Sequence, residues 1–416
     1  MSSRWWGVSV LRSAVAVVSL LVLIAGCGST PRAELKTGPG ITADTITLGV
    51  LTDQTGPFSP TTPSKIKGFE LLIDEVNAGG GICGRKLGMT IADHGYDVQR
   101  ALTGYFDLEP KVLGFLDITG SPMMEAIAPD LLQSRVIAAP TSWSADLLGN
   151  PNLMIVGSTY DLDVINGLSR LKKDGLLADG DTIGHIYVPG DYGQGALEGS
   201  QFAAQQWRLN LQAREIPETG TELPAMFAQL KNAGAKAVFL STTPKQTALG
   251  VVAAEAMKWD VPIMVNAVGF DPAMLASPAA PAVVKRVKVV APFAPFGADL
   301  PGAKEVSGAF NRKFPGVEAT AAVNHGYSVG LSFASVLRKA CGNGDMTREG
   351  MLRAFRQTDH LDTRSLTGPL RFSQAGRPSS DQSFLVKPDL DAPGKLSLID
   401  GPFTSELAKQ KASKPR

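Results

Sequence analysis

Residues 111–143 constrain the fold of this chain more than any other stretch of its sequence. An apolar run of strand length, residues 112–118, is followed by a turn and then by apolar residues at helical spacing. Residues 135–139 form a second apolar run. A strand, a helix and a strand of this length make a βαβ unit, in which the two strands lie parallel.

Hydroxyl-bearing side chains follow both predicted strands of this unit. Ser121 suits the N-cap of the helix and Pro122 its first position, while Thr141 and Ser142 follow the second strand. Open α/β sheets bind ligands at the carboxyl ends of their strands, and the free amides of a helix N-terminus attract anions. We therefore expect Ser121, Thr141 and Ser142 to line a pocket for a small ligand with a carboxylate or an amide. The alternative is that Ser121 only caps its helix and that the other two lie in a solvated loop.

Apolar runs of strand length alternate with segments of helical periodicity along most of the chain. Strands are expected at residues 46–53, 87–93, 182–188, 211–215, 237–240, 262–265 and 366–372. This alternation indicates an α/β fold with mainly parallel sheets flanked by helices. Because a second series begins after residue 161, and 416 residues exceed one ordinary core, we expect two lobes.

The expected crossings of the chain between the lobes set their boundaries. Lobe 1 is predicted to comprise residues 46–161 and 292–365, and lobe 2 residues 162–291 and 366–405. The short basic segment of residues 406–416 is expected to be a disordered tail.

Composition excludes several classes of function. Forty basic and 39 acidic residues leave a net charge of +1, so no basic excess points to nucleic acid. The four histidines are scattered without the spacing of metal ligands, and no phosphate-binding loop appears. We therefore expect neither a metal site nor a cofactor.

The N-terminus predicts export and anchoring. Residues 1–26 carry two arginines and no acidic residue, and residues 14–25 are an almost unbroken apolar run of signal-peptide length. The run ends in LIAGC, which resembles the lipobox of bacterial lipoproteins and implies cleavage before Cys27 and a lipid on its sulfur. Residues 27–45 are then a flexible tether that holds the protein on the outer side of the cell membrane. The alternative is an ordinary signal peptide followed by a chance cysteine.

Two further cysteines, Cys83 and Cys341, remain after this anchor. An oxidising compartment permits a disulfide between them. The alternative is two buried free thiols.

Four motifs indicate a known family. Residues 74–87 are DEVNAGGGICGRKL, residues 191–195 are DYGQG, residues 366–372 are LTGPLRF, and Gly326 and Tyr327 lie in a long predicted helix. Together they resemble the leucine/isoleucine/valine-binding type of periplasmic binding protein, the solute receptors of ABC importers, over about residues 46–402. The resemblance implies the two-lobed type I fold, a small-molecule ligand, permease subunits as partners and no catalysis. We expect the protein to act as a monomer.

The resemblance also implies which loops contact the ligand. They are the loops that follow the predicted strands of both lobes, and the site residues are Ser121, Thr141, Ser142, Trp143, Tyr160, Asp161, Tyr192 and Thr242. A tyrosine or tryptophan in such a loop supplies an apolar face with a polar tip. Trp143 is expected either to stack on the ligand or to pack at the rim.

Two departures from the amino-acid binders bear on the ligand. The loop at residues 139–143 is APTSW, where those proteins typically have Ser-Pro-x-Ala-Thr. The acidic partner for a ligand ammonium should fall within residues 266–270, which contain no acid, and Asp271 is close but not at the matching place. A buried ammonium without a carboxylate is costly. An amide, an organic acid or a larger apolar ligand therefore fits as well as an amino acid.

Two other functions are weighed against a solute receptor for import. One is a sensor that uses the same clamp to signal to a membrane partner. The other is a serine hydrolase, because residues 326–330 fit the string G-x-S-x-G around Ser328. The order of His360 and Asp362 downstream, and the helical pattern after Ser328, disfavour the hydrolase.

Overall fold

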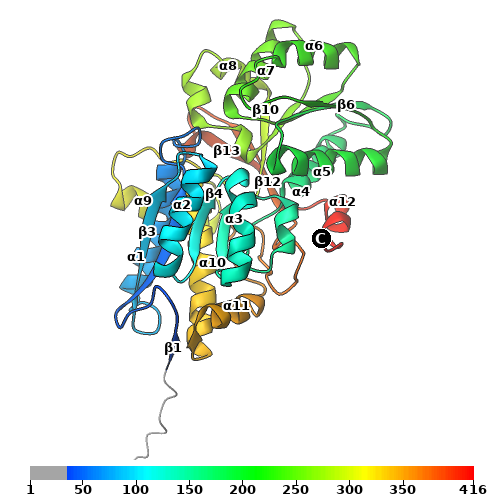
Figure 1. Ribbon diagram of the computed structural model, residues 1–416. Helices are drawn as coiled ribbons and strands as arrows, with labels where there is room; N and C mark the ends of the chain where they lie inside the picture. The colour runs from blue at the N-terminus through cyan, green and yellow to red at the C-terminus, as the bar shows by residue number, and fades with distance from the viewer. Residues whose placement is uncertain (1–34) are drawn as a thin grey trace, which may run out of the picture. The chain divides into compact units, whose positions relative to one another are not determined.

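The computed structural model describes residues 35–416, which form one compact unit (Figure 1). The predicted signal peptide and Cys27 lie outside the described residues. No helix of residues 35–416 has both the length and the apolar character needed to cross a membrane. The unit consists of two α/β lobes, each built on its own sheet.

Lobe 1 is built on a four-stranded parallel sheet in the order β3-β2-β4-β5. Its strands are β2 (Thr45–Thr52), β3 (Lys86–Asp93), β4 (Phe115–Thr119) and β5 (Ala138–Thr141). Its helices are α1 (Thr62–Ala78), α2 (Val98–Leu108), α3 (Ser121–Ser134), α9 (Pro301–Lys313), α10 (Ala322–Gly342) and α11 (Arg348–Arg356). The βαβ unit predicted within residues 111–143 is thus formed by β4, α3 and β5. A short strand β1 (Lys36–Thr37) pairs with β11 (Asp345–Met346) below this sheet.

Lobe 2 is built on a seven-stranded sheet in the order β13-β12-β10-β9-β8-β6-β7. Its parallel strands are β6 (Thr182–Tyr187), β7 (Asn210–Glu215), β8 (Ala237–Ser241), β9 (Ile263–Asn266) and β10 (Val287–Ala291). The antiparallel strands β12 (Ser383–Pro388) and β13 (Leu396–Phe403) close one edge. The helices are α4 (Tyr160–Lys173), α5 (Asp191–Trp207), α6 (Leu223–Asn232), α7 (Pro244–Ala256), α8 (Ala280–Arg286) and α12 (Glu406–Ala412).

Four local predictions are wrong. Residues 27–45 are not a flexible tether throughout, because Lys36–Thr37 form β1 and pair with β11. Residues 366–372 form no strand, because Leu366, Leu370 and Phe372 instead pack as a loop into the core of lobe 1. The C-terminal segment is not a disordered tail but contains α12, whose Leu407 is buried against α4. The N-cap of α3 is Gly120, whose φ of 101° suits glycine, and Ser121 is the first helical residue.

A buried polar cluster, which we call the hinge cluster, joins segments that pass between the lobes. Asp163 accepts hydrogen bonds from the hydroxyls of Ser158 and Ser383, each at 2.6 Å. Ser379 donates to the carbonyl oxygen of Ile155 at 2.6 Å. Burial raises the pKa of Asp163 to about 7. These bonds tie the chain before α4 to the chain before β12.

Helices α1 and α10 pack backbone to backbone in lobe 1. A Cβ atom added to Gly68 would overlap the carbonyl oxygen of Val323, and one added to Gly326 would overlap that of Lys65. The disulfide between Cys83 and Cys341 links the loop after α1 to the end of α10. The two helices are therefore held in one register along their length.

We expect Gly326→Ala to lower the free energy of unfolding by about 1–3 kcal/mol, because the added methyl group forces α1 and α10 apart. Gly342→Ala is the matched control on the same helix, since nothing lies within 4 Å of its added Cβ atom. There the change should be neutral or stabilising by up to about 1 kcal/mol. Urea unfolding measures both variants, and equal effects would contradict the close helix contact.

Candidate ligand site between the lobes

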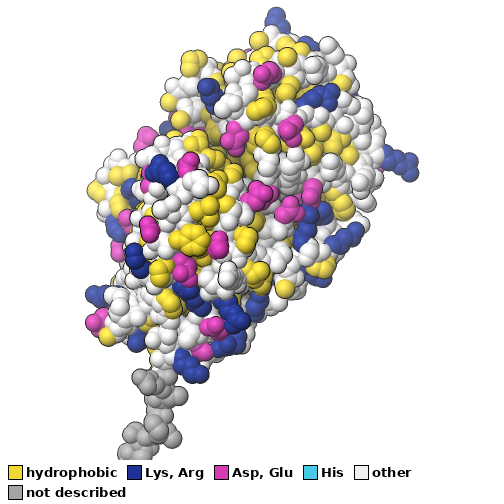
Figure 2. Space-filling view, in the orientation of Figure 1, with side chains coloured by type: hydrophobic (Ala, Val, Ile, Leu, Met, Phe, Trp, Pro, Cys, Tyr) yellow, Lys and Arg dark blue, Asp and Glu magenta, His cyan; other side chains and the backbone are white. Residues whose placement is uncertain are grey.

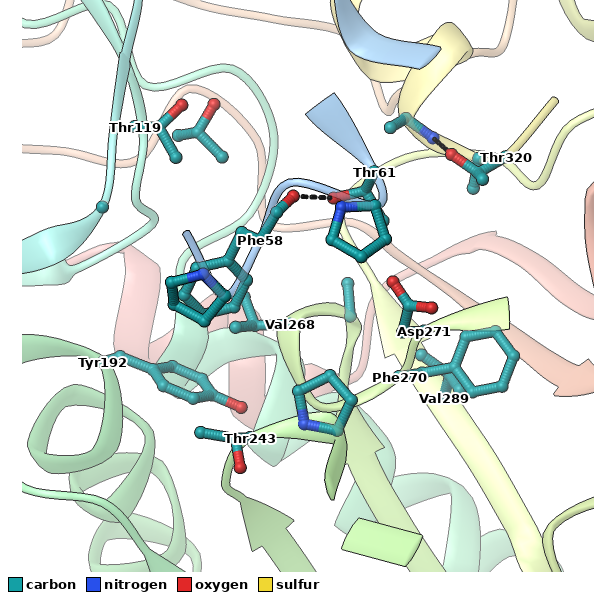
Figure 3. A pocket seen from close by; sticks show the side chains of 18 of the residues that line it. Phe58, Thr61, Thr119, Tyr192, Thr243, Val268, Phe270, Asp271, Val289 and Thr320 are labelled. Carbon is teal, nitrogen blue, oxygen red and sulfur yellow. Dashed lines mark hydrogen bonds between the residues drawn. The ribbon is translucent and has the colours of Figure 1, made fainter. Parts of the chain in front are cut away.

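A cavity of about 750 Å³, which we call the interlobe cavity, lies between the two lobes. Lobe 1 contributes the starts of α1 and α10, the turn from β4 to α3 and the loop after β5. Lobe 2 contributes the loops after β6, β8 and β9. Figure 2 shows apolar side chains in the hollow where the lobes meet. In Figure 3, Phe58 of lobe 1 faces Tyr192 and Val268 of lobe 2 across this space.

Five of the predicted site residues line the interlobe cavity: Ser121, Thr141, Trp143, Tyr160 and Tyr192. They come from both lobes, since Tyr160 begins α4 and Tyr192 lies in the first turn of α5. The carboxyl ends of β4 and β5 in lobe 1 and of β6 in lobe 2 therefore face one space, and such strand ends are where open α/β sheets bind ligands.

The other three predicted residues do not reach the cavity. Ser142 is fully buried behind Ser121, and their hydroxyl oxygens lie 2.8 Å apart. Asp161 is buried next to α12, where the Nζ atom of Lys411 lies 3.8 Å from its Oδ2 atom. Thr242 is buried, and the next residue, Thr243, lines the cavity instead.

Aromatic side chains form much of the cavity wall. The Trp143 ring lies 4.9 Å from His325 and 5.9 Å from Phe293, measured between ring centroids. The rings of Tyr160 and Tyr192, both of lobe 2, lie 4.9 Å apart. The Trp143 indole is fixed by its Nε1 atom, which donates to the carbonyl oxygen of Val156 at 3.0 Å. This wall presents rigid apolar faces to a ligand.

Lys65 is a buried cation of the cavity that sequence reasoning missed. Its Nζ atom lies 2.7 Å from Asp117 Oδ2 and donates to the hydroxyls of Thr119 at 2.6 Å and Thr141 at 3.0 Å. Both hydroxyls in turn donate to the Asp117 carboxylate. An ammonium has three protons, so each is already bound. The only sequence signal was a lysine next to Ile66 on the apolar face of α1.

Hydroxyl groups collect at the start of α3. The Tyr160 hydroxyl lies beside those of Ser121 and Ser142, and burial raises the pKa of Tyr160 to about 12. The first turn of α3 also leaves the amides of Ser121 and Met123 without helical partners. This end of the cavity can therefore donate hydrogen bonds to an oxygen acceptor.

His325 of α10 is a second residue that the sequence did not reveal. It lines the cavity, is 3% exposed, and its Nε2 atom has no hydrogen-bond partner among the described residues. Burial lowers its pKa to about 3, so the imidazole is neutral at physiological pH. A neutral imidazole that packs on Trp143 and Phe293 offers a ligand a polar atom without a charge.

Acidic residues line the lobe 2 side of the cavity. Asp271 follows Phe270 and lies in Figure 3 on the side away from Tyr192. Its carboxylate accepts from the backbone N–H of Ala273 at 2.7 Å and so caps a 3-10 helix, and burial raises its pKa. Burial also raises the pKa of Glu218, at the edge of the cavity. Among residues 35–416, no cluster of three or more His, Cys, Asp or Glu side chains is placed to hold a metal ion.

The hydrolase hypothesis is excluded by the position of Ser328. This serine is fully buried in the middle of α10, where its hydroxyl donates to the carbonyl oxygen of Asn324 at 2.7 Å. A nucleophile elbow requires an exposed serine on a turn from strand to helix.

The fold and the cavity define a two-lobed binding protein, and comparison with known proteins places it in a family. The sequence pattern of the periplasmic binding proteins matches residues 45–391. The chain belongs to this family: it is the solute-binding protein of an ABC transporter, with the type I fold, and not an enzyme. The resemblance inferred from the sequence is confirmed.

Several solved structures are similar over almost their whole length. A fatty acid ABC transporter substrate-binding protein from Thermomonospora curvata is 35% identical, with a TM-score of 0.87, over 92% of this chain and 98% of that one. A branched-chain amino acid ABC transporter protein from Thermus thermophilus, with bound valine, is 15% identical, with a TM-score of 0.74, over 90% and 100%. No curated protein matches the sequence.

We expect the buried imidazole of His325 to make stability depend on pH. Its pKa is about 3 in the folded chain against 6.5 for the free side chain, so the unfolded chain binds more protons between these values. Its contribution is fully present above pH 6.5 and is lost as the pH falls from 6.5 towards 3. His325→Gln removes this titration and should flatten the dependence by up to about 1.4 kcal/mol per pH unit.

Urea unfolding across this pH range tests the effect of His325. His360→Gln, a substitution of an exposed histidine outside the cavity, is the matched control. An identical slope in the wild type and in His325→Gln would show that the imidazole is not held neutral.

Proposed function

We propose that this protein captures an amphiphilic carboxylic acid with an apolar chain, such as a fatty acid, and delivers it to the permease of an ABC importer. The lipid on Cys27 that the sequence predicts would hold it near that permease. The observation that carries the proposal is the large aromatic cavity, whose buried lysine is already neutralised by a carboxylate of the protein.

The size and lining of the cavity favour an apolar chain. A volume of about 750 Å³ lies in the upper part of the range of small-molecule sites. Its walls include Phe58, Val268, Phe270 and Val289, which Figure 3 shows around the same space. Burying each methylene of a chain against such walls gains about 0.8 kcal/mol.

The polar groups of the cavity suit an oxygen acceptor better than an α-amino acid. Ser121, Tyr160 and the free amides of α3 are all donors. Asp117 has its oxygens committed to Lys65, Thr119 and Thr141, so it cannot serve a ligand ammonium without losing these bonds. Asp271, the acid nearest to the family's ammonium partner in the sequence, caps its own helix.

The similar protein from Thermomonospora curvata supports the same ligand class, since it is named for fatty acids and shares 35% of its residues with this chain. The structure with bound valine is only 15% identical and supports the fold alone. The mechanism is closure of the lobes: a ligand that contacts Ser121 in lobe 1 and Tyr192 in lobe 2 stabilises the closed state by binding it more tightly than the open one.

We expect saturated fatty acids, but not free leucine or valine, to bind and to raise the melting temperature by mass action. Ser121→Ala should weaken fatty acid binding roughly ten- to hundredfold, because a hydrogen bond to a charged group is worth about 1.5–3 kcal/mol. Ser142→Ala is the matched control. The substitution removes the same hydrogen bond between the two serines, but Ser142 itself does not line the cavity. Isothermal titration calorimetry measures both variants.

Equal losses for the two serine variants would show that Ser121 acts only through the local structure. Tight binding of leucine, with no binding of any fatty acid, would contradict the proposed ligand class.

A further inference from the structure

A second pocket of about 460 Å³ adjoins the interlobe cavity, and we call it the side pocket. The two share wall residues, among them Pro60, Asp271, Ala273 and Thr320. The side pocket lies between the start of α1, the 3-10 helix Pro272–Ala276 and the chain before α10. The two spaces are therefore adjacent, and the shared residues lie at their junction.

The side pocket lies at the end of the cavity away from the hydroxyl groups of α3. In Figure 3, Thr119 and Tyr192 are on one side, while the shared residues Thr320 and Asp271 are on the other. Phe58 and Val268 lie between these two ends, and Phe270 lies on the same side as Asp271. An elongated ligand with its polar group near Ser121 would therefore direct its other end towards the side pocket.

Eight of the fourteen residues that line the side pocket are apolar. Leu275, Ala276, Val317 and Leu390 line it, and Val317 and Leu390 are 44% and 50% exposed. Hydrocarbon bound in the side pocket would cover these two side chains and remove their apolar surface from water.

The charged residues of the side pocket do not form an anion site. Its two lysines are balanced by two acids, Asp271 and Glu318. The Nζ atom of Lys395 donates to the carbonyl oxygen of Leu390 at 2.8 Å, and that of Lys67 lies 5.6 Å from the centroid of the Phe314 ring. The pocket thus suits the hydrocarbon end of an amphiphile better than its carboxylate.

We propose that the side pocket binds the distal methylenes of the ligand chain, so that the protein selects long-chain over short-chain acids. This inference rests on the proposed function and specifies its substrate class. Short acids fill only the interlobe cavity, whereas longer chains pass Ala273 and Thr320 into the side pocket. Each methylene that becomes buried there should tighten binding roughly three- to fourfold.

The test is isothermal titration calorimetry with saturated acids from hexanoic to octadecanoic acid, each below its critical micelle concentration. For the wild type we expect the affinity to keep rising through the longest acids. Ala276→Trp places a large side chain in the side pocket at an exposed position that does not line the interlobe cavity. This substitution should lower the affinity for the longest acids at least tenfold and leave the affinity for the shortest acids unchanged.

Two control variants separate this effect from others. Ala225→Trp makes the same substitution at an exposed site on α6 that lines neither space, and it should alter no affinity. Lys67→Gln removes a charge from the side pocket, and it should change the affinity of every acid by less than about twofold.

The possible outcomes are distinct. If no acid of any length binds the wild type, both this inference and the proposed function fail. If acids bind but Ala276→Trp affects long and short chains alike, or neither, the proposed function stands and the side pocket is not a chain site. An equal loss for all lengths in Lys67→Gln would place the carboxylate there and overturn the inference.

Discussion

The buried ion pair between Lys65 and Asp117 is the interaction on which the rest of the site depends. The pair links α1 to β4 and, through Thr141, to β5. Lys65, Asp117 and Thr141 thus form one electrically neutral cluster in the wall of the cavity. Loss of either partner would leave a buried charge, at a cost of about 3–5 kcal/mol. Because the charges of Lys65 and Asp117 neutralise each other, the cavity presents aromatic faces and a few hydroxyl donors to a ligand rather than a free charge.

The packing of lobe 1 places the two polar residues that the cavity needs. The backbone of α10 contacts that of α1 at Gly326, next to His325, and the group it meets on α1 is the carbonyl of Lys65. The glycine therefore sets the separation of the two helices that carry these side chains. The hinge cluster around Asp163 plays the corresponding role between the lobes, where closure on a ligand must act.

Local pattern was enough to predict most of the fold and part of the site. Apolar periodicity and turn residues defined β4, α3 and β5, and strand polarity then placed Ser121, Thr141 and Tyr192 around one space. Lys65 and His325 were missed because their role depends on burial between helices far apart in sequence. Residues 366–372 have the apolar pattern of a strand, but they form a loop whose apolar side chains pack into the core of lobe 1. The position of Ser142 behind Ser121 depends on a side-chain contact that no sequence pattern specifies.

The central claim is that one ligand touches both lobes and holds them together. Small-angle X-ray scattering of the protein, with and without a saturating long-chain acid, tests this claim most directly. A smaller radius of gyration with the acid, and no change with leucine, is the predicted result. An unchanged scattering curve under conditions where calorimetry shows the acid bound would contradict the claim.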